Sequence, residues 1–235
     1  MVTFLQLTLI FFVGSLGGWC MELVFRRVVH KKWINPGFLV GPYLPLYGFG
    51  LTFLFVICSF DYGFIANPVW QKVFVIAIIT IVMTLTEYVT GLLFIKGMRV
   101  KLWDYSDRWG NIQGIICPLF SLIWGVIGAI YYLFVHDKIV GATVWMANHL
   151  AYGYFVGVIS GVMTVDVIHS FNVVDKIRKW AKEHQVLIKY EEFKLNIKRR
   201  SEERKLKRNF FLYVKREDLK EQLQKYLDDK QKTQK

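Results

Sequence analysis

Two carboxylates lie inside long apolar stretches of the chain, where a charge is costly. Glu87 lies nine residues before Lys96, which is about 13 Å along a helix from the nearest basic end. Glu22 precedes Arg26 by one helical turn, the favoured order for an ion pair on a helix. Because a charge at the centre of a bilayer costs at least about 2.5 kcal/mol, both are candidates for binding a substrate or a proton. The structural alternatives are a protonated Glu87 bonded to a neighbouring helix and an interfacial Glu22–Arg26 ion pair.

A second candidate group lies in the loop that follows Lys96. Loops are normally rich in small residues, whereas this one combines aromatic with charged and amide side chains, which suits recognition of a polar or anionic group at a membrane surface. The alternative is an aromatic belt in which Asp104 pairs with Arg108. The candidate residues are Arg99, Asp104, Tyr105, Arg108 and Asn111.

A short Gly/Pro motif occurs twice, once at residues 41–48 and once at residues 114–121. Each copy opens an apolar stretch and follows a stretch that contains a carboxylate and then a basic loop, which indicates a duplicated helix-loop-helix unit. Prolines at helix starts free backbone groups, and such groups survive at membrane depth only under protein cover or beside a wet cavity. The motifs are therefore predicted to line a cavity mouth formed by Gly41, Pro42, Tyr43, Pro45, Tyr47, Gly114 and Pro118.

The elements that carry these residues are predicted to cross a membrane. The chain has 235 residues, of which 54% are hydrophobic, and its apolar runs are too long for the helices of a soluble core. We expect an all-α integral membrane protein with a transmembrane domain at residues 1–169. Its five spans are predicted at about 4–24, 44–60, 69–95, 115–135 and 139–168, with His136, Asp137 and Lys138 in the turn between the last two.

Cations predict the orientation of this bundle. Eight Lys or Arg residues lie at the ends predicted for one side and two at the other, which places the N-terminus outside and the C-terminus in the cytoplasm of a multi-pass protein of the cell membrane. Asp166 and His169, three residues apart, are expected to mark the inner interface, the alternative being that they join the polar site.

The remaining residues, 170–235, are predicted to form a basic cytoplasmic helical tail. This part carries twenty Lys or Arg residues against eleven Asp or Glu residues. It begins with an amphipathic helix and continues through a charged run at 197–208, an apolar patch at 210–214 and a last helix near 219–227. A basic amphipathic segment beside a membrane is typical of binding to anionic lipid, and the interleaved acidic residues argue against nucleic acid. One face of the first helix is formed by Val173, Val174, Ile177, Trp180 and Ala181.

Several functions have no motif here. The three cysteines are scattered through apolar segments, so no metal site and no cofactor are expected. No phosphate-binding glycine loop, serine nucleophile motif or HExxH is present, so an ATPase would have to be a separate subunit, and enzymatic activity is left open but not favoured.

The chain resembles the family labelled putative ABC-transporter type IV, or CmpB-like permeases, over about residues 10–160. The resemblance rests on Glu22, Glu87, the segment 35–38, the first Gly/Pro motif and Trp103-Asp104-Tyr105-Ser106. It implies a multi-pass bacterial membrane protein that acts as a permease component.

Three hypotheses follow. The leading one is a permease subunit, dimeric or paired with a separate ATPase, whose Glu22 and Glu87 bind substrate or protons in a cavity open to the cytoplasm. The second is a membrane-embedded enzyme acting on a lipid or phosphorylated headgroup, with Asp104 or Glu87 as general base and Arg99 and Arg108 holding phosphate. The third is a non-catalytic scaffold whose tail senses anionic lipid.

Overall fold

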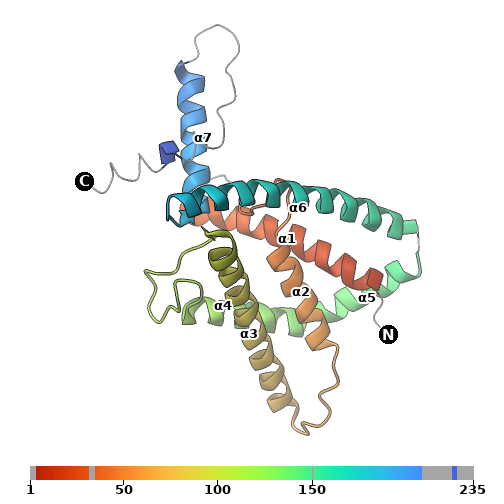
Figure 1. Cartoon of the computed structure of the whole chain (residues 1–235). Coiled ribbons are helices and arrows are strands. Elements are labelled where there is room, and N and C mark those ends of the chain that lie inside the picture. Colours follow the sequence, from red (N-terminus) through yellow and green to blue (C-terminus); the bar gives the residue numbers. More distant parts are fainter. Residues whose placement is uncertain (1–3, 32–34, 150, 208–223, 227–235) are drawn as a thin grey trace. The chain divides into compact units, whose positions relative to one another are not determined.

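The protein was analysed as a computed structural model, which describes residues 4–31, 35–149, 151–207 and 224–226. Contacts divide the chain into two units, one made of Met1–Leu92 with Asp104–Phe171 and the other of Leu93–Trp103 with Asn172–Lys235. Figure 1 labels the seven α-helices. In chain order the elements, with η1 and η2 as π-helical turns, are α1 (Phe4–His30), α2 (Pro45–Cys58), α3 (Pro68–Leu92), η1 (Leu93–Gly97), β1 (Val100–Lys101), α4 (Pro118–Ile130), η2 (Tyr131–Val135), α5 (His136–Ala147), α6 (Ala151–Glu183), β2 (Ile188–Lys189) and α7 (Tyr190–Lys207).

Four helices are long and apolar enough to cross a bilayer. They are Phe4–Val28, Pro68–Gly97, Pro118–Met146 and Ala151–Glu183. The fifth apolar helix, α2, has 14 residues, or about 21 Å at 1.5 Å per residue, which is short for a hydrocarbon core of about 30 Å.

The turn between the predicted fourth and fifth spans is misplaced. His136, Asp137 and Lys138 lie inside the continuous helix Pro118–Met146, and the chain turns after it, around Asn148 and His149. Because every backbone hydrogen bond of a helix is made within the segment, a charged pair does not by itself end one. Asp137 and Lys138 are exposed, so the helix continues through them without burying a charge.

Glycines bring α1 and α2 into close contact. A Cβ atom on Gly14 would lie 2.7 Å from Cβ of Leu51 and 2.9 Å from the carbonyl oxygen of Tyr47, and a Cβ atom on Gly18 would collide with the Tyr47 ring. This spacing of small residues lets two helix backbones approach closely in a membrane. The crossing fixes Tyr47 against the face of α1 that carries Glu22.

Small residues allow close packing in α4 but not in the middle of α6. Gly125 and Gly128 of α4 contact Thr80 and Ile79 of α3. In α6, by contrast, a Cβ atom on Gly157 would meet no described atom within 4 Å. The apolar core of the first unit joins α2, α3 and η2 through Leu54, Ile57, Val75, Ile79, Met83 and Tyr131.

The second unit combines the chain after α3 with the tail. Strand β1 pairs in parallel with β2, and the Ile188 amide donates to the Arg99 carbonyl at 3.1 Å. The predicted apolar face of the tail is largely buried, with Val174 and Ile177 at 1% and 0% exposure. That face belongs to the second unit and lies on the last part of α6, which ends at Glu183. The apolar patch at 210–214 and the last predicted helix, apart from residues 224–226, lie outside the described residues.

Candidate functional site

Both Gly/Pro motifs lead directly into helices. Pro45 is the first residue of α2 and Pro118 the first residue of α4, and the residues before them, Leu44 and Cys117, are extended. Proline suits a first helical position because its missing N–H would have had no partner inside the helix. The two motifs therefore place the aromatic residue two positions later, Tyr47 or Phe120, on the first turn of each helix.

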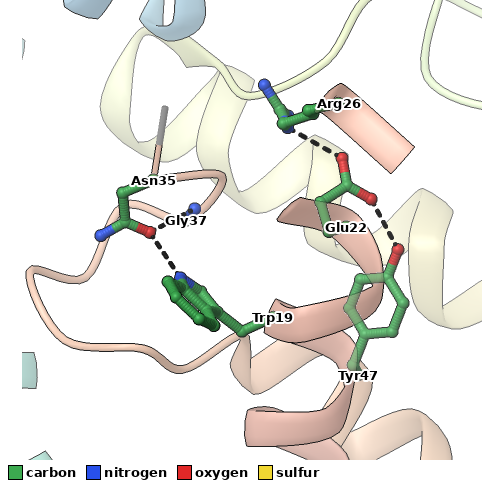
Figure 2. A network of polar contacts seen from close by, with 6 residues as sticks. All are labelled: Trp19, Glu22, Arg26, Asn35, Gly37 and Tyr47. Atoms are coloured by element: carbon green, nitrogen blue, oxygen red, sulfur yellow. Dashed lines mark hydrogen bonds and ion pairs between the residues drawn. The ribbon is translucent and has the colours of Figure 1, made fainter. Parts of the chain in front are cut away.

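Glu22 is held by two partners (Figure 2). The Arg26 guanidinium donates to Oε1 at 3.0 Å as an ion pair on α1, and the Tyr47 hydroxyl donates to Oε2 at 2.9 Å from α2. Both oxygens are thus occupied, and the glutamate charge is balanced by a cation one turn away. The predicted Glu22–Arg26 pair is present.

Glu87 is held differently. The Tyr105 hydroxyl donates to Oε1 at 3.0 Å and the Trp124 indole N–H donates to Oε2 at 3.1 Å. Glu87 is only 4% exposed, and among the described residues no Lys or Arg forms an ion pair with it. The residue one turn later is Gly91, so the counterpart of Arg26 is missing.

The tyrosine of the second site comes from a loop instead of a helix. Phe120 occupies the position that corresponds to Tyr47 but has no hydroxyl. Tyr105 lies flat on Phe120, with ring centroids 4.3 Å apart and planes at 9°, and supplies the missing phenol. The rings of Tyr47 and Trp124 also contact each other, at 5.6 Å. The two carboxylate sites therefore form one polar cluster, defined here as Glu22, Arg26, Tyr47, Glu87, Tyr105 and Trp124.

The first loop, residues 35–44, is fixed from two sides. The Asn35 carboxamide accepts from the Trp19 indole at 2.9 Å and from the Gly37 amide at 3.3 Å (Figure 2). It also donates to the carbonyls of Leu39 and Val40. On the other side, the Asp166 carboxylate of α6 accepts from the Val40 amide at 3.0 Å and the Gly41 amide at 2.7 Å. Asp166 does not simply mark the interface, because it binds this loop.

The second loop, residues 98–117, is held together by its own side chains. Asn111 donates to the carbonyls of Ser106 and Arg108 and accepts from the Gly114 amide. The Gly114 carbonyl in turn accepts from the Tyr105 amide at 2.9 Å. Gly114 has a φ of +65°, a conformation that glycine adopts without strain. This arrangement presents the Tyr105 side chain to Glu87.

The other predicted loop residues do not donate to Glu22 or Glu87 in the described part of the chain. The Asp104 carboxylate accepts from the Ser106 amide and hydroxyl. Arg108 is exposed. Arg99 belongs to the second unit, where its carbonyl receives the Ile188 amide.

Burial shapes the chemistry of the loop tyrosine. Burial, and then the charge of Glu87, raise the pKa of Tyr105 above its usual range. Tyr105 therefore keeps its proton at physiological pH and acts on Glu87 as a hydrogen-bond donor. The described residues contain no group of His, Cys, Asp and Glu side chains able to hold a metal ion, and an open groove on α1 is apolar, lined by Cys20, Met21, Val24, Phe25 and Val28.

The family assignment comes from a match over residues 9–171. The chain belongs to the family described as "Putative ABC-transporter type IV". The matched range covers more than half of the chain and contains every residue of the polar cluster, both loops and Asp166. It ends where the first unit ends, so the family relation concerns the membrane part and not the tail. No curated protein and no solved structure matches the chain.

Sequence reasoning does not single out Trp124, because a tryptophan within an apolar run normally indicates packing or an interfacial belt. Asp166 is named in the sequence analysis, as a marker of the inner interface or as part of the polar site. Its signal is the same as that of Glu87, a carboxylate within an apolar stretch. Trp124 gives no comparable signal in the sequence.

Proposed function

We propose that this chain is a permease subunit of a transporter in the cell membrane and that the polar cluster is its site for a substrate cation or a proton. In this proposal Glu87 is the group that gains and loses the charge. The observation that carries the proposal is that Glu87, 4% exposed and within a helix able to span a bilayer, has hydrogen-bond donors but no cation among its described partners.

The charge balance of the cluster supports this role. Glu22 forms an ion pair with Arg26, whereas no ion pair with Glu87 is formed by the Lys and Arg residues in the described part of the chain. An isolated buried carboxylate in a membrane is costly, and such a group normally carries a proton or faces a cation. Because Tyr105 and Trp124 each occupy one oxygen, a further lone pair on each oxygen remains for a proton or an ammonium group.

A neighbouring hydroxyl supports the same reading. Oγ1 of Thr84 is buried and has no hydrogen-bond partner among the described residues. Thr84 lies three residues before Glu87 on α3, a spacing that puts both on one helix face. A buried hydroxyl without a partner costs about 1–3 kcal/mol, and a ligand at Glu87 would offset that cost. In this proposal the polar cluster lies in a cavity that opens to the cytoplasm.

The proposal includes an orientation and partners. The positive-inside rule places the N-terminus outside and the two loops, with the tail, in the cytoplasm. A separate ATPase subunit and a second copy of the chain are the protein partners that we propose. Anionic lipid is a further partner of the tail, through exposed cations such as Lys176, Lys179 and Lys182, because Val174 and Ile177 are already buried.

The test is purification of the tagged chain from its native membrane in mild detergent, with mass spectrometry of the proteins and lipids that elute with it. Wild type is compared with Glu87→Gln and with a matched control, Asp107→Asn, which changes an exposed loop carboxylate. We expect an ATPase subunit in a fixed ratio to all three, and a cationic small molecule, if one is bound, to be lost only from Glu87→Gln.

Other outcomes would redirect the assignment. Enrichment of one lipid without any ATPase would contradict the permease role and favour the enzyme acting on lipid headgroups. If truncation of the chain after Ser170 abolishes its function in the cell while Glu87→Gln leaves that function unchanged, the scaffold hypothesis replaces the permease hypothesis.

A further inference from the structure

A π-helical turn brings together two buried side chains that do not belong to the polar cluster. At the end of η2 the backbone amide of His136 donates to the carbonyl of Tyr131. Residues three and four apart are neighbours on an α-helix, whereas this i→i+5 bond brings residues five apart onto one face. The Tyr131 hydroxyl consequently lies 3.3 Å from Nδ1 of His136. Such turns inside α-helices are frequent at functional sites.

Protein covers this pair. Tyr131 is 4% exposed and His136 is 9% exposed, and Phe55 of α2 contacts the imidazole with ring centroids 5.6 Å apart. A neutral imidazole has one donor and one acceptor nitrogen, so a hydroxyl that donates to Nδ1 places the ring proton on Nε2. Nδ1 can take up a second proton, because the hydroxyl oxygen can then accept from it.

The surroundings of the imidazole are largely uncharged. The described part of α1, which contacts α5, has no titratable side chain before Cys20. The titratable side chains of the other elements at this level of the bundle are Tyr132, Asp137 and Lys138 on the same helix, Cys58 on α2, Tyr62 after α2 and Lys72 on α3. The three charged ones are exposed, so water screens them. Tyr131 is therefore the side chain best placed to influence the proton on the ring.

The helix that carries the pair is antiparallel to α3. Gly91, near the end of α3, meets Ile115 just before α4, whereas Ile79, in the first half of α3, meets Gly128 near the end of α4. The end of α4 and the turn η2 therefore lie beside the first half of α3, away from Glu87.

Apolar side chains separate the pair from Glu87. The buried positions of α3 follow at four-residue spacing through Val75, Ile79, Met83 and Glu87, and Tyr131 packs in one core cluster with the first three. Val75 lies twelve residues before Glu87, about 18 Å along the helix. Valine, isoleucine and methionine side chains cannot pass a proton on, so this layer insulates the two ends from each other.

His136 is placed to exchange protons with water at its own end. It lies 18 residues after Pro118, about 27 Å along the helix, which is close to the thickness of a hydrocarbon core of about 30 Å. Asp137 and Lys138 follow it directly and are exposed, as expected for charges at a membrane surface. In the proposed orientation this is the outer surface.

We propose that His136 is a second proton-binding site, at the end of the bundle opposite Glu87, and that Tyr131 is its positioning residue. The imidazole takes up a proton on Nδ1 from the outer side, and Tyr131 holds the ring in the tautomer that leaves Nδ1 as the acceptor. Participation of this site in transport rests on the proposed function, whereas proton binding at His136 does not.

The experiment is solid-state NMR of the full chain in lipid nanodiscs, with histidine labelled by 13C and 15N, between about pH 4 and 9, a range around the ordinary histidine pKa. His136→Gln identifies the His136 signals. In wild type we expect a neutral ring with Nδ1 as acceptor at high pH and a doubly protonated ring at low pH. Tyr131→Phe removes a bond that favours the neutral ring, so its midpoint should lie about half to one pH unit higher.

Two controls accompany this measurement. Tyr132→Phe removes the next hydroxyl along the helix, which makes no hydrogen bond to His136 in the described part of the chain, and should leave the midpoint unchanged. His149 is exposed, and its Nδ1 lies 2.7 Å from the Trp145 carbonyl, so its signals serve as a reference in the same spectra. The wild-type tautomer requires no variant and decides the role of Tyr131 if Tyr131→Phe fails to fold.

A His136 ring that stays neutral throughout this range would overturn the proton site. A neutral ring with its proton on Nδ1, a midpoint moved to lower pH in Tyr131→Phe, or an equal shift in Tyr132→Phe would overturn the role of Tyr131. If His136 titrates as expected while the infrared carboxyl band of Glu87 does not change with pH, the second site stands and the proposed function fails.

Discussion

Tyr105→Phe is the most informative single substitution in the polar cluster. It removes the hydroxyl that donates to Glu87 at 3.0 Å and keeps the ring that stacks on Phe120 at 4.3 Å. The packing of the second loop should therefore survive. The Trp124 donor at 3.1 Å also remains, so Glu87 loses one of its two hydrogen bonds and nothing else.

The magnitude follows from the charge state that the bond favours. A hydroxyl that donates to a carboxylate stabilises the ionised form, so its removal favours the protonated acid. A hydrogen bond to a charged group is worth about 1.5–3 kcal/mol, and about 1.4 kcal/mol corresponds to one pH unit. We expect the Glu87 carboxyl to keep its proton to a pH about one to two units higher than in wild type.

The assay is infrared difference spectroscopy of the protein in lipid, with Glu87→Gln used to identify the Glu87 band. Tyr154→Phe is the matched control, because Tyr154 lies on α6 and is 73% exposed. Three results would refute the assignment of Tyr105 as a donor to an ionisable Glu87. They are a shift of the Glu87 titration below about 0.3 pH units, a shift to lower pH, and an equal shift in the control. The first would refute it because the expected shift is several times larger.

Two further substitutions test the helix crossing and the first carboxylate. Gly14→Ala should destabilise the bundle by about 1–3 kcal/mol through overpacking. Gly17→Ala should be neutral or slightly stabilising, because no described atom lies within 4 Å of the added Cβ. Thermal unfolding in detergent compares the two variants, and equal melting temperatures would contradict the close crossing of α1 and α2. Arg26→Gln should leave Glu22 without its cation and add a second titrating carboxyl band, and an unchanged infrared spectrum would show that the pair does not set the charge of Glu22.

The apolar helices and the two carboxylates of the polar cluster could be predicted from the sequence because both depend on local properties. Long apolar runs identify α1, α3 and α6 directly. Glu87 stands out because the cost of a charge in a membrane does not depend on its partners. Pro45 and Pro118 likewise indicate helix starts from their own covalent geometry.

The rest depends on contacts between distant residues. No pattern in the sequence indicates that Trp124 reaches Glu87 across 37 residues or that Asp166 reaches Gly41 across 125. Strands β1 and β2 have two residues each, too few for an alternating pattern. The continuous helix through Asp137 differs from the predicted turn because charged residues between two apolar runs are also typical of a turn, whereas the backbone hydrogen bonds of a helix do not depend on those side chains.

The phenol that donates to Glu87 is a clear case of this limit. The two Gly/Pro motifs align Tyr47 with Phe120, which has no hydroxyl, so the alignment alone predicts no phenol donor at Glu87. Tyr105 of the second loop donates to Glu87 instead. Its position beside Phe120 is evident only from the structure.

The central claim is that Glu87 exchanges a proton or a cation within the membrane. The direct measurement is the infrared carboxyl spectrum of wild type and Glu87→Gln in lipid between about pH 4 and 9, a range that begins near the unperturbed pKa of a glutamate and includes physiological pH. We predict a carboxyl band that changes with pH, or with an added organic cation, in wild type and is missing from Glu87→Gln. Identical spectra for the two proteins across this range would contradict the claim.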